Sequence, residues 1–309
     1  MAFAFLFPGQ GSQSLGMMNG FEAHPVVRAT FDEASAVLGE DLWAMLSADT
    51  PDAINQTVNT QPIMLTAGVA VWRAWLALGG ATPSAVAGHS LGEYSALVAA
   101  EAIQFADAVR LVRVRAQAMQ NAVPAGTGAM AAVLGLDDAE IVAACAEAAL
   151  DDVVEAVNFN SPGQVVIAGS QAAVARAIEA CKARGAKRAM PLPVSVPSHC
   201  ALMKPAAEVL SAALSDIEVV APRIPVLHNA DVASYADPAE IRQALARQLY
   251  RPVRWTETIR HLVADGVDAM AECGPGKVLA GLNKRIDSSI RSSALTDGQA
   301  LSDALAALA

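Results

Sequence analysis

The chain has 309 residues, of which 54% are hydrophobic and 17% charged, so it can fill one large or two modest cores and does not have the composition of a disordered protein. The formal net charge of −10 argues against nucleic-acid binding. The four cysteines contain no C-x-x-C pair, so the sequence indicates neither a zinc site nor a disulfide framework.

The apolar N-terminal run, residues 3–7, is cut short by Pro8 and Gly9 and has no basic residues before it. It therefore predicts a buried first strand and not a signal peptide. The longest apolar stretch, residues 63–78, is interrupted by Arg73 and is too short to span a bilayer. We expect a cytoplasmic protein that does not bind membranes.

Short strands alternate with helices along the chain, which predicts an α/β architecture. The expected strands include residues 3–7, 85–88 and 269–272, and the expected helices include residues 26–38, 61–78, 106–122 and 278–286. Thr50-Pro51 and Asp237-Pro238 each place an N-cap residue before a proline, which predicts that helices begin there.

The middle of the chain has a different pattern, in the order β-α-β-β-α-β, which is that of a ferredoxin-like unit. Its expected elements are residues 130–134, 138–149, 153–158, 164–168, 171–183 and 188–192. Turn-forming segments at residues 123–128 and 191–193 border it. We predict a small subdomain at residues 126–195, inserted into a large α/β domain made of residues 1–125 and 196–309.

The most informative motif is G-x-S-x-G at residues 88–92, between an expected strand and a good helix former. This is the context of a nucleophile elbow, in which a sharp turn exposes a serine at the edge of a sheet. The alternative is a serine that merely occupies a tight turn. We predict that Ser90 is a nucleophile.

A serine nucleophile needs a base, and the chain has five histidines. His89 adjoins Ser90, but neighbours in an extended segment point to opposite faces. His199 follows the predicted subdomain, and Ser198 before it could cap a helix, so His199 would face a cleft between the two parts. The other histidines remain open as alternatives on spacing alone.

Two turns could supply hydrogen-bond donors to an oxyanion. The glycine-rich turn at residues 7–13 could present a backbone N–H, and Leu91 follows the nucleophile directly. An ordinary strand-to-helix turn explains residues 7–13 equally well.

Arg115 falls within the apolar stripe of helix 106–122, whereas Arg110 and Arg113 lie largely off it. An arginine that faces a core cannot lose its charge and needs an anion. That anion is either an Asp or Glu of the chain, in a structural ion pair, or a substrate carboxylate.

Five motifs, taken together, resemble those of the malonyl-CoA:acyl-carrier-protein transacylases of type II fatty-acid synthesis, and the similarity covers essentially the whole chain. They are residues 7–13 (FPGQGSQ), 88–94 (GHSLGEY), 157–164 (VNFNSPGQ), 196–199 (VPSH) and 274–277 (GPGK). The resemblance implies a hydrolase-like parallel-sheet domain with an inserted ferredoxin-like subdomain, in agreement with the pattern of elements.

The resemblance also implies roles for individual residues. Ser90 is the nucleophile, His199 its base, and the backbone amides of Gln10 and Leu91 form the oxyanion hole. The residues implied in substrate binding are Arg115 (for the malonyl carboxylate), Gln10, Asn160 and Ser198.

Two positions depart from the family's pattern. In the family, a backbone carbonyl near a Pro-Val-x-Trp segment orients the histidine. That segment is residues 252–255 here, with Arg254 where relatives often have glutamine, so the resemblance implies the Arg254 backbone for this role. Many malonyl-selective relatives have phenylalanine in place of Ser198. A smaller residue leaves room for an α-methyl group, and one methylene discriminates by only about 1–3 kcal/mol.

The expected activity is ping-pong transfer of malonyl from malonyl-CoA to the phosphopantetheine thiol of acyl carrier protein, with no metal or redox cofactor and as a monomer. A hydrolase and a non-catalytic carrier-protein scaffold are the alternatives; Arg115 argues against an esterase for neutral acyl groups. The acidic carrier protein would need a local basic patch. The candidates are Lys182, Arg184, Lys187 and Arg188, or else Lys284 and Arg285, and the first cluster could equally be a solvated helix end.

Overall fold

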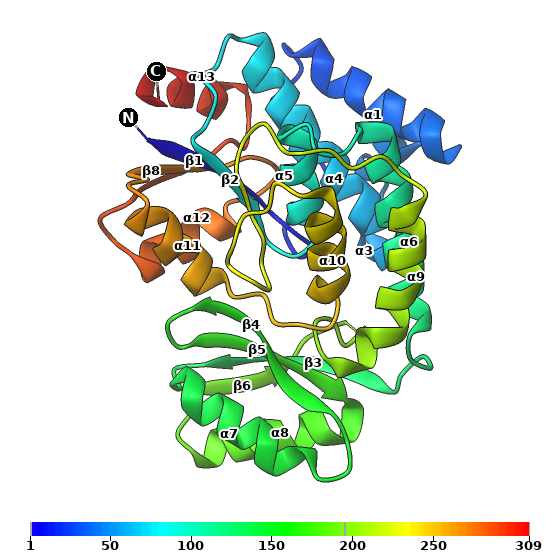
Figure 1. Ribbon diagram of the computed structural model, residues 1–309, viewed down its shortest axis with the longest axis vertical. Coiled ribbons are helices and arrows are strands. Elements are labelled where there is room, and N and C mark those ends of the chain that lie inside the picture. Colours follow the sequence, from blue (N-terminus) through cyan, green and yellow to red (C-terminus); the bar gives the residue numbers. More distant parts are fainter. Residues whose placement is uncertain (1, 195, 309) are drawn as a thin grey trace.

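The chain folds around two sheets, which lie in the upper and lower halves of Figure 1. The computed structural model describes residues 2–194 and 196–308. The strands are β1 (Phe3–Phe7), β2 (Ala85–Gly88), β3 (Gly128–Leu134), β4 (Val154–Ser161), β5 (Gln164–Ser170), β6 (Arg188–Pro191), β7 (Val226–Leu227), β8 (Ala269–Glu272) and β9 (Arg291–Ala294). The helices are α1 (Pro25–Leu38), α2 (Leu42–Leu46), α3 (Asp52–Asn55), α4 (Thr57–Ala77), α5 (Gly92–Ala99), α6 (Phe105–Asn121), α7 (Asp138–Ala149), α8 (Gln171–Ala183), the 3₁₀ helix η1 (Ala201–Met203), α9 (Lys204–Ser215), α10 (Pro238–Gln248), α11 (Trp255–Ala264), α12 (Val278–Ile286) and α13 (Gly298–Leu308).

The larger sheet has five strands in the order β7-β2-β1-β8-β9, and each neighbouring pair is parallel. The central strand β1 pairs with β2 and β8, so that Phe7 aligns with Gly88 and Leu6 with Glu272. The turns that follow these three strands therefore meet at one edge of the sheet. In open α/β sheets this carboxyl edge is where ligands bind.

Strand β1 shows why both faces of the parallel sheet carry helices. Phe3, Phe5 and Phe7 are buried in one core together with α4 and α5, whereas Ala4 and Leu6 are buried in another with α11 and α12. Successive strand residues point to opposite faces, so a strand covered on both sides is apolar throughout. This explains the unbroken apolar run at the N-terminus.

The smaller sheet has four antiparallel strands in the order β4-β5-β3-β6 and packs against α7 and α8, which are green in Figure 1. Its element order, β3-α7-β4-β5-α8-β6, is that of a ferredoxin-like unit. The predicted fold class, a parallel-sheet α/β core with an inserted ferredoxin-like unit, is confirmed. The predicted domain boundaries remain a prediction, and the one at residue 195 lies outside the described residues.

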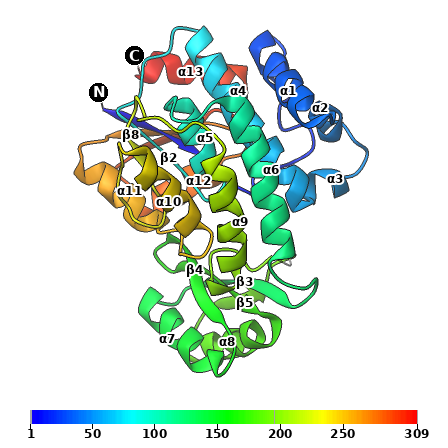
Figure 2. The same cartoon turned by 45° about the vertical axis from the view of Figure 1, so that its right-hand side comes forward.

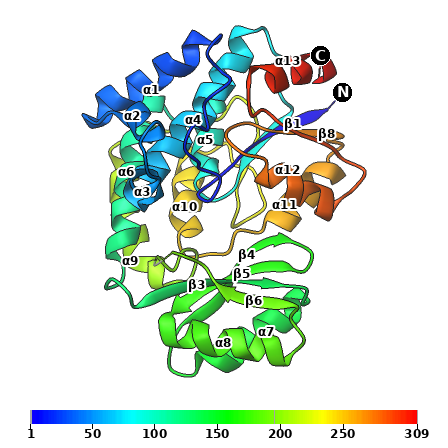
Figure 3. The same ribbon diagram turned by 180° about the vertical axis from the view of Figure 1, so that it is seen from behind.

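Backbone hydrogen bonds join strand β4 of the antiparallel sheet to the segment that precedes α11. The Phe159 N–H donates to the Val253 carbonyl at 3.0 Å, and the Val253 N–H donates to the Val157 carbonyl at 2.8 Å. Figure 3 shows α11 and α12 above the antiparallel sheet, in contact with β4. On the other side, α6 and α9 pack side by side (Figure 2). The segment around Val253 thus holds β4 against the part of the chain that contains the parallel sheet.

The expected strands at residues 3–7, 85–88 and 269–272 are confirmed to the residue. The predicted start of the next long helix at residue 61 is wrong, because α4 begins at Thr57 and contains Pro62. Within the described ranges, no helix has both the length and the apolarity needed to cross a membrane.

The two predicted proline-associated helix starts have different outcomes. Asp237-Pro238 begins α10 as expected, and the Asp237 side chain accepts a backbone N–H of the first turn at 2.9 Å. The helix start predicted at Thr50-Pro51 is one position too early, since α3 begins at Asp52 with Pro51 as its N-cap. The Thr50 hydroxyl donates to the Asp52 carboxylate at 3.1 Å instead of capping the helix.

Candidate active site

Ser90 lies on the sharp turn between β2 and α5. Its φ of 52° is in the left-handed region, which few non-glycine residues adopt. A Cβ on Gly88 would lie 1.9 Å from the Gly92 carbonyl carbon, and a Cβ on Gly92 would lie 2.0 Å from the Phe7 carbonyl oxygen. Both positions therefore require glycine, and the motif forms the strand–turn–helix of a nucleophile elbow.

His199 contacts Ser90 from a distant part of the chain. Its Nε2 lies 2.7 Å from Ser90 Oγ, and its Nδ1 lies 2.7 Å from the Gln248 backbone oxygen. A carbonyl can only accept, so Nδ1 carries the proton and Nε2 offers a lone pair to the serine hydroxyl. The pair has the geometry of a nucleophile and its base.

The carbonyl that orients His199 belongs to Gln248, and the prediction of Arg254 for this role is wrong. The Arg254 carbonyl lies at the start of α11, where it accepts the Thr258 N–H at 2.9 Å and the Thr258 hydroxyl at 3.0 Å. Gln248 is the last residue of α10, and the last carbonyls of a helix have no intrahelical partner. The C-terminus of α10 therefore supplies the carbonyl that accepts the His199 Nδ1–H.

The protonation of His199 suits a base. Burial, together with the nearby Arg115 charge, lowers the pKa of His199 from 6.5 to about 3. The ring is therefore neutral at physiological pH and can accept the Ser90 proton.

His89 contacts Asn160 through its ring and not the Ser90 hydroxyl, so it is not placed to act as the base. Its Nε2 lies 2.8 Å from the Asn160 Oδ1, and burial lowers the pKa of His89. The contact brings Asn160, on β4, against the elbow of the parallel sheet. Asn160 also lines the cavity in front of Ser90.

Arg115 is buried on α6, with 1% of its surface exposed, and its Nη2 lies 3.2 Å from Ser90 Oγ. Two neutral amides hold it: Nη1 donates to Gln61 Oε1 at 2.8 Å and Nη2 to Gln248 Oε1 at 3.0 Å. Across residues 2–194 and 196–308, no carboxylate forms an ion pair with Arg115. The structural ion pair considered from the sequence is therefore not formed.

The turns that carry Gln10 and Leu91 lie against each other. A Cβ on Gly9 would be 2.4 Å from the His89 carbonyl oxygen and 3.7 Å from the Leu91 nitrogen. The His89 N–H donates to the Phe7 carbonyl at 2.9 Å, which holds the two turns together. Gln10 and Leu91 both line the cavity beside Ser90.

A cavity of about 530 Å³ opens in front of Ser90, between the parallel-sheet part and the antiparallel sheet. Among its lining residues are all the sequence-predicted site residues except Arg254: Gln10, Ser90, Leu91, Arg115, Asn160, Ser198 and His199. Both parts of the fold therefore contribute to one site.

Ser198 lines the cavity but does not cap a helix, so that expectation is wrong. Its hydroxyl faces the Val196 carbonyl at 3.5 Å. The nearest helical turn, η1, has Cys200 as its N-cap.

The first candidate basic patch is partly neutralised. Arg184 contacts Glu140 at 2.9 Å and Glu147 at 2.7 Å, and Lys182 contacts Glu179 at 2.8 Å. From the second cluster, Arg285 donates to the Gln164 side chain at 2.6 Å, and Gln164 lines the cavity.

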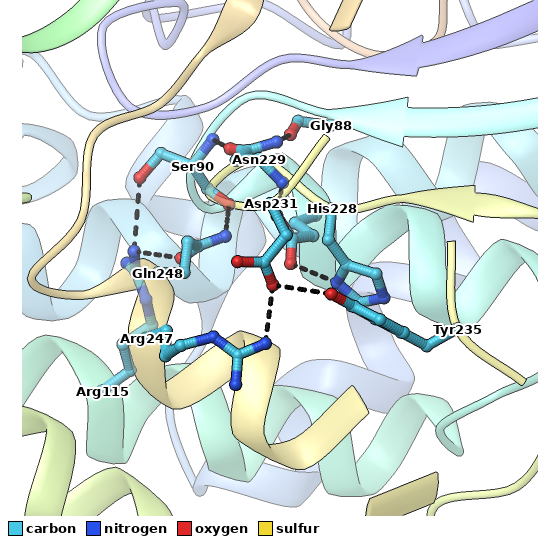
Figure 4. A network of polar contacts seen from close by, with 10 residues as sticks. Gly88, Ser90, Arg115, His228, Asn229, Asp231, Tyr235, Arg247 and Gln248 are labelled. Carbon is cyan, nitrogen blue, oxygen red and sulfur yellow. Dashed lines mark hydrogen bonds and ion pairs between the residues drawn. The ribbon is translucent and has the colours of Figure 1, made fainter. Parts of the chain in front are cut away.

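Sequence reasoning missed the amide side chains that surround the catalytic pair: Gln61, Gln248 and Asn229. Asn229 binds the backbone of the elbow, and Gln248 donates to the Ser90 carbonyl at 2.9 Å (Figure 4). No sequence motif marks these positions. The described residues contain no cluster of His, Cys, Asp and Glu that could hold a metal ion.

The elbow serine, its histidine and the two adjacent turns define a serine acyltransferase site. Residues 4–296 match the family model described as "Acyl transferase domain", and the chain belongs to this family. It is 59% identical over 304 residues to the malonyl CoA-acyl carrier protein transacylase of Salmonella typhimurium strain LT2, covering 98% of each chain.

Solved structures agree with this similarity. One contains a malonyl-transacylase in complex with the holo acyl-carrier protein of a type II PKS; the match has a TM-score of 0.98 and 55% identity, and covers 99% of this chain and 100% of that one. An acyl carrier protein S-malonyltransferase from Vibrio cholerae matches with a TM-score of 0.96 and 55% identity, over 98% of this chain and 100% of that one.

Proposed function

We propose that this chain transfers a malonyl group from malonyl-CoA to the phosphopantetheine thiol of acyl carrier protein, through a malonyl-Ser90 intermediate. The observation that carries the proposal is Arg115. Its hydrogen-bond partners among the described residues are the neutral Gln61, Ser90 and Gln248. A buried cation with such partners, 3.2 Å from the nucleophile, is suited to bind the free carboxylate of a malonyl group.

In the first half-reaction, Ser90 Oγ attacks the thioester carbonyl carbon while its proton passes to His199 Nε2. The Gln10 and Leu91 amides donate to the oxyanion, and loss of one such donor typically costs about 3–4 kcal/mol of transition-state stabilisation. The carbon–sulfur bond then breaks, and the CoA sulfur takes the proton from His199. A malonyl ester on Ser90 remains.

The second half-reaction reverses these roles. The phosphopantetheine thiol gives its proton to His199 and attacks the ester carbonyl. The bond to Ser90 Oγ breaks, and the serine recovers its proton.

Asn160 and Ser198 complete the proposed substrate pocket. Asn160 reaches it from β4 and Ser198 from the segment that precedes His199. We assign residues 1–125 and 196–309 to the large domain, which supplies the nucleophile and the base, and residues 126–195 to the subdomain, which supplies Asn160. The proposed setting is the cytoplasm, with the protein acting as a monomer.

The intact mass after incubation with malonyl-CoA tests the proposal. The wild-type protein should gain one malonyl group, and Ser90→Ala should not. Addition of holo acyl carrier protein should remove the group from the enzyme and increase the carrier protein's mass by the same amount. Release as free malonate, with no gain by the carrier protein, would show a hydrolase instead.

A further inference from the structure

Asn229 lies beside the nucleophile elbow, between the Ser90 N–H and the Gly88 carbonyl (Figure 4). Its Oδ1 accepts the Ser90 N–H at 2.6 Å, and its Nδ2 donates to the Gly88 carbonyl at 2.6 Å. These two backbone groups flank His89 in the turn. One side chain therefore fixes the backbone on both sides of that residue.

Asn229 is itself fully held. Its N–H donates to Glu93 Oε2 at 2.8 Å, and its carbonyl accepts the Arg254 N–H at 3.2 Å. Glu93 Oε1 lies 2.7 Å from His228 Nδ1, and these side chains are all buried. Hydrogen bonds therefore anchor both the backbone and the side chain of Asn229.

The elbow needs such support because of its backbone conformation. A non-glycine residue in the left-handed region costs about 1–3 kcal/mol and persists only where the surroundings over-determine it. Ser90 has a φ of 52°, and its neighbours Gly88 and Gly92 are the most flexible residue type. Without Asn229, this flexible turn would lose both bonds that fix the Ser90 N–H and the Gly88 carbonyl.

A second tie links the Asn229 loop to the helix that holds His199. Asp231 Oδ2 accepts from Arg247 at 2.6 Å and from the Tyr235 hydroxyl at 3.2 Å (Figure 4). Arg247 precedes Gln248, whose backbone carbonyl orients His199 and whose side chain donates to the Ser90 carbonyl. Asn229 thus holds the Ser90 N–H, Gln248 holds the Ser90 carbonyl, and the Asp231–Arg247 contact connects the two segments that carry them.

We propose that Asn229, held by Glu93, is a positioning residue that sets the Ser90 hydroxyl at its distance from His199 and the substrate carbonyl. The inference rests on the proposed role of Ser90 as the nucleophile. Asn229 is not among the residues that line the cavity, and its side chain bonds the Ser90 and Gly88 backbone, so we infer that it acts through that backbone.

Single-turnover formation of malonyl-Ser90, followed by rapid quench and intact mass, tests this role. A displacement of about 1 Å of a reacting group costs on the order of 10²-fold in rate. In Asn229→Ala we therefore expect the rate at saturating malonyl-CoA to fall by about 10²-fold, while the half-saturating concentration changes by less than about threefold.

Asn283→Ala is the matched control. Asn283 is also fully buried, but its side chain bonds the Ser292 hydroxyl at 3.3 Å, away from the elbow. It should lower the melting temperature and leave the saturating rate unchanged. Equal losses of rate in the two variants would overturn the inference.

Glu93 provides the conservative comparison. Glu93→Gln keeps an oxygen that can accept the Asn229 N–H and should retain most of the rate, whereas Glu93→Ala should lose the rate as Asn229→Ala does.

If Asn229→Ala does not fold, the isosteric Asn229→Asp carries the test, because it keeps the acceptor for the Ser90 N–H and loses the donor to the Gly88 carbonyl. A folded Asn229 variant with the wild-type saturating rate overturns the positioning role while leaving the function intact. A wild-type protein that forms no malonyl adduct overturns both.

Discussion

Ser90 and His199 are 109 residues apart in the chain, and each has a left-handed backbone, with φ of 52° and 67°, where their side chains meet at 2.7 Å. Both conformations are uncommon for residues with a Cβ, and such strain collects at functional sites. The His199 N–H donates to the Leu249 carbonyl at 3.0 Å, next to the Gln248 carbonyl that holds its ring. The end of α10 therefore fixes both the backbone and the side chain of the base.

Removal of the base should slow both half-reactions. We expect His199→Ala to reduce malonyl loading and transfer to the carrier protein by a factor of about 10² to 10⁴, since that is the usual contribution of a positioned general base. Rapid-quench measurement of each step checks this. His89→Ala is the comparison: its ring contacts Asn160, so the limb of the pH profile that reports the titration of the base should match the wild type. Near-normal turnover in His199→Ala would show that another group acts as base.

Arg115 should set the preference for a carboxylated acyl group. Arg115→Ala should abolish the preference for malonyl over acetyl thioesters, and Arg115→Lys should restore it only in part because an ammonium lacks the planar two-donor geometry. Competition between the two thioesters, read by intact mass, measures this. Arg110→Ala on the same helix is the control, as Arg110 is exposed and paired with Asp107. Unchanged selectivity in Arg115→Ala would rule out the carboxylate role.

The buried state of His199 makes stability depend on pH. Its pKa in the folded protein, about 3, lies below its usual value of 6.5, so between these pH values the unfolded chain binds a proton that the folded one does not. This contribution to stability is complete above pH 6.5 and is lost as the pH falls toward 3. Melting temperatures between pH 7 and about 4 should therefore fall less steeply for His199→Ala than for the wild type. Parallel curves would contradict a depressed pKa.

The close approach of the two turns requires glycine at position 9. A methyl group there would meet the His89 carbonyl at 2.4 Å and force the turns apart, which should misplace the Gln10 and Leu91 amides. We expect Gly9→Ala to lower the saturating rate of loading by about 10²- to 10³-fold, as loss of an oxyanion donor does. Gly281→Ala in α12 is the control, because nothing lies within 4 Å of its Cβ.

Charge reversal at Arg285 should raise the KM for acyl carrier protein, because Arg285 borders the cavity through Gln164. The effect should fade with salt, since exposed charges are screened beyond about 10 Å at 0.1 M. Lys182→Glu is the comparison, because Lys182 is already paired with Glu179. A rise in KM for Lys182→Glu alone would place docking on the first basic cluster instead.

The sequence predicted the elbow, the apolar position of Arg115 and the order of elements, because each follows from local spacing along the chain. It could not find the acceptor for His199, because Gln248 acts through a backbone carbonyl, which every residue type has. The wrong choice of Arg254 has the same origin: only the fold shows that its carbonyl already serves the first turn of α11.

Asn229 and Gln61 were missed for a related reason. Each is a neutral amide in a segment without a motif, and its role depends on contacts with residues 139 and 54 positions away, respectively. Glu93 carried a usable signal: a glutamate in the first turn after the elbow, within an otherwise apolar and buried helix, requires a buried partner.

The supports of Ser90 also have a consequence during synthesis. The residues that fix its backbone, Asn229 and Gln248, lie 139 and 158 positions closer to the C-terminus, and its base also lies downstream. While the ribosome is still translating that part, the emerging serine has neither its left-handed conformation imposed nor its proton acceptor in place. A nascent chain therefore should not react with cellular thioesters, and chemical competence arrives only when the C-terminal third has been made and has docked.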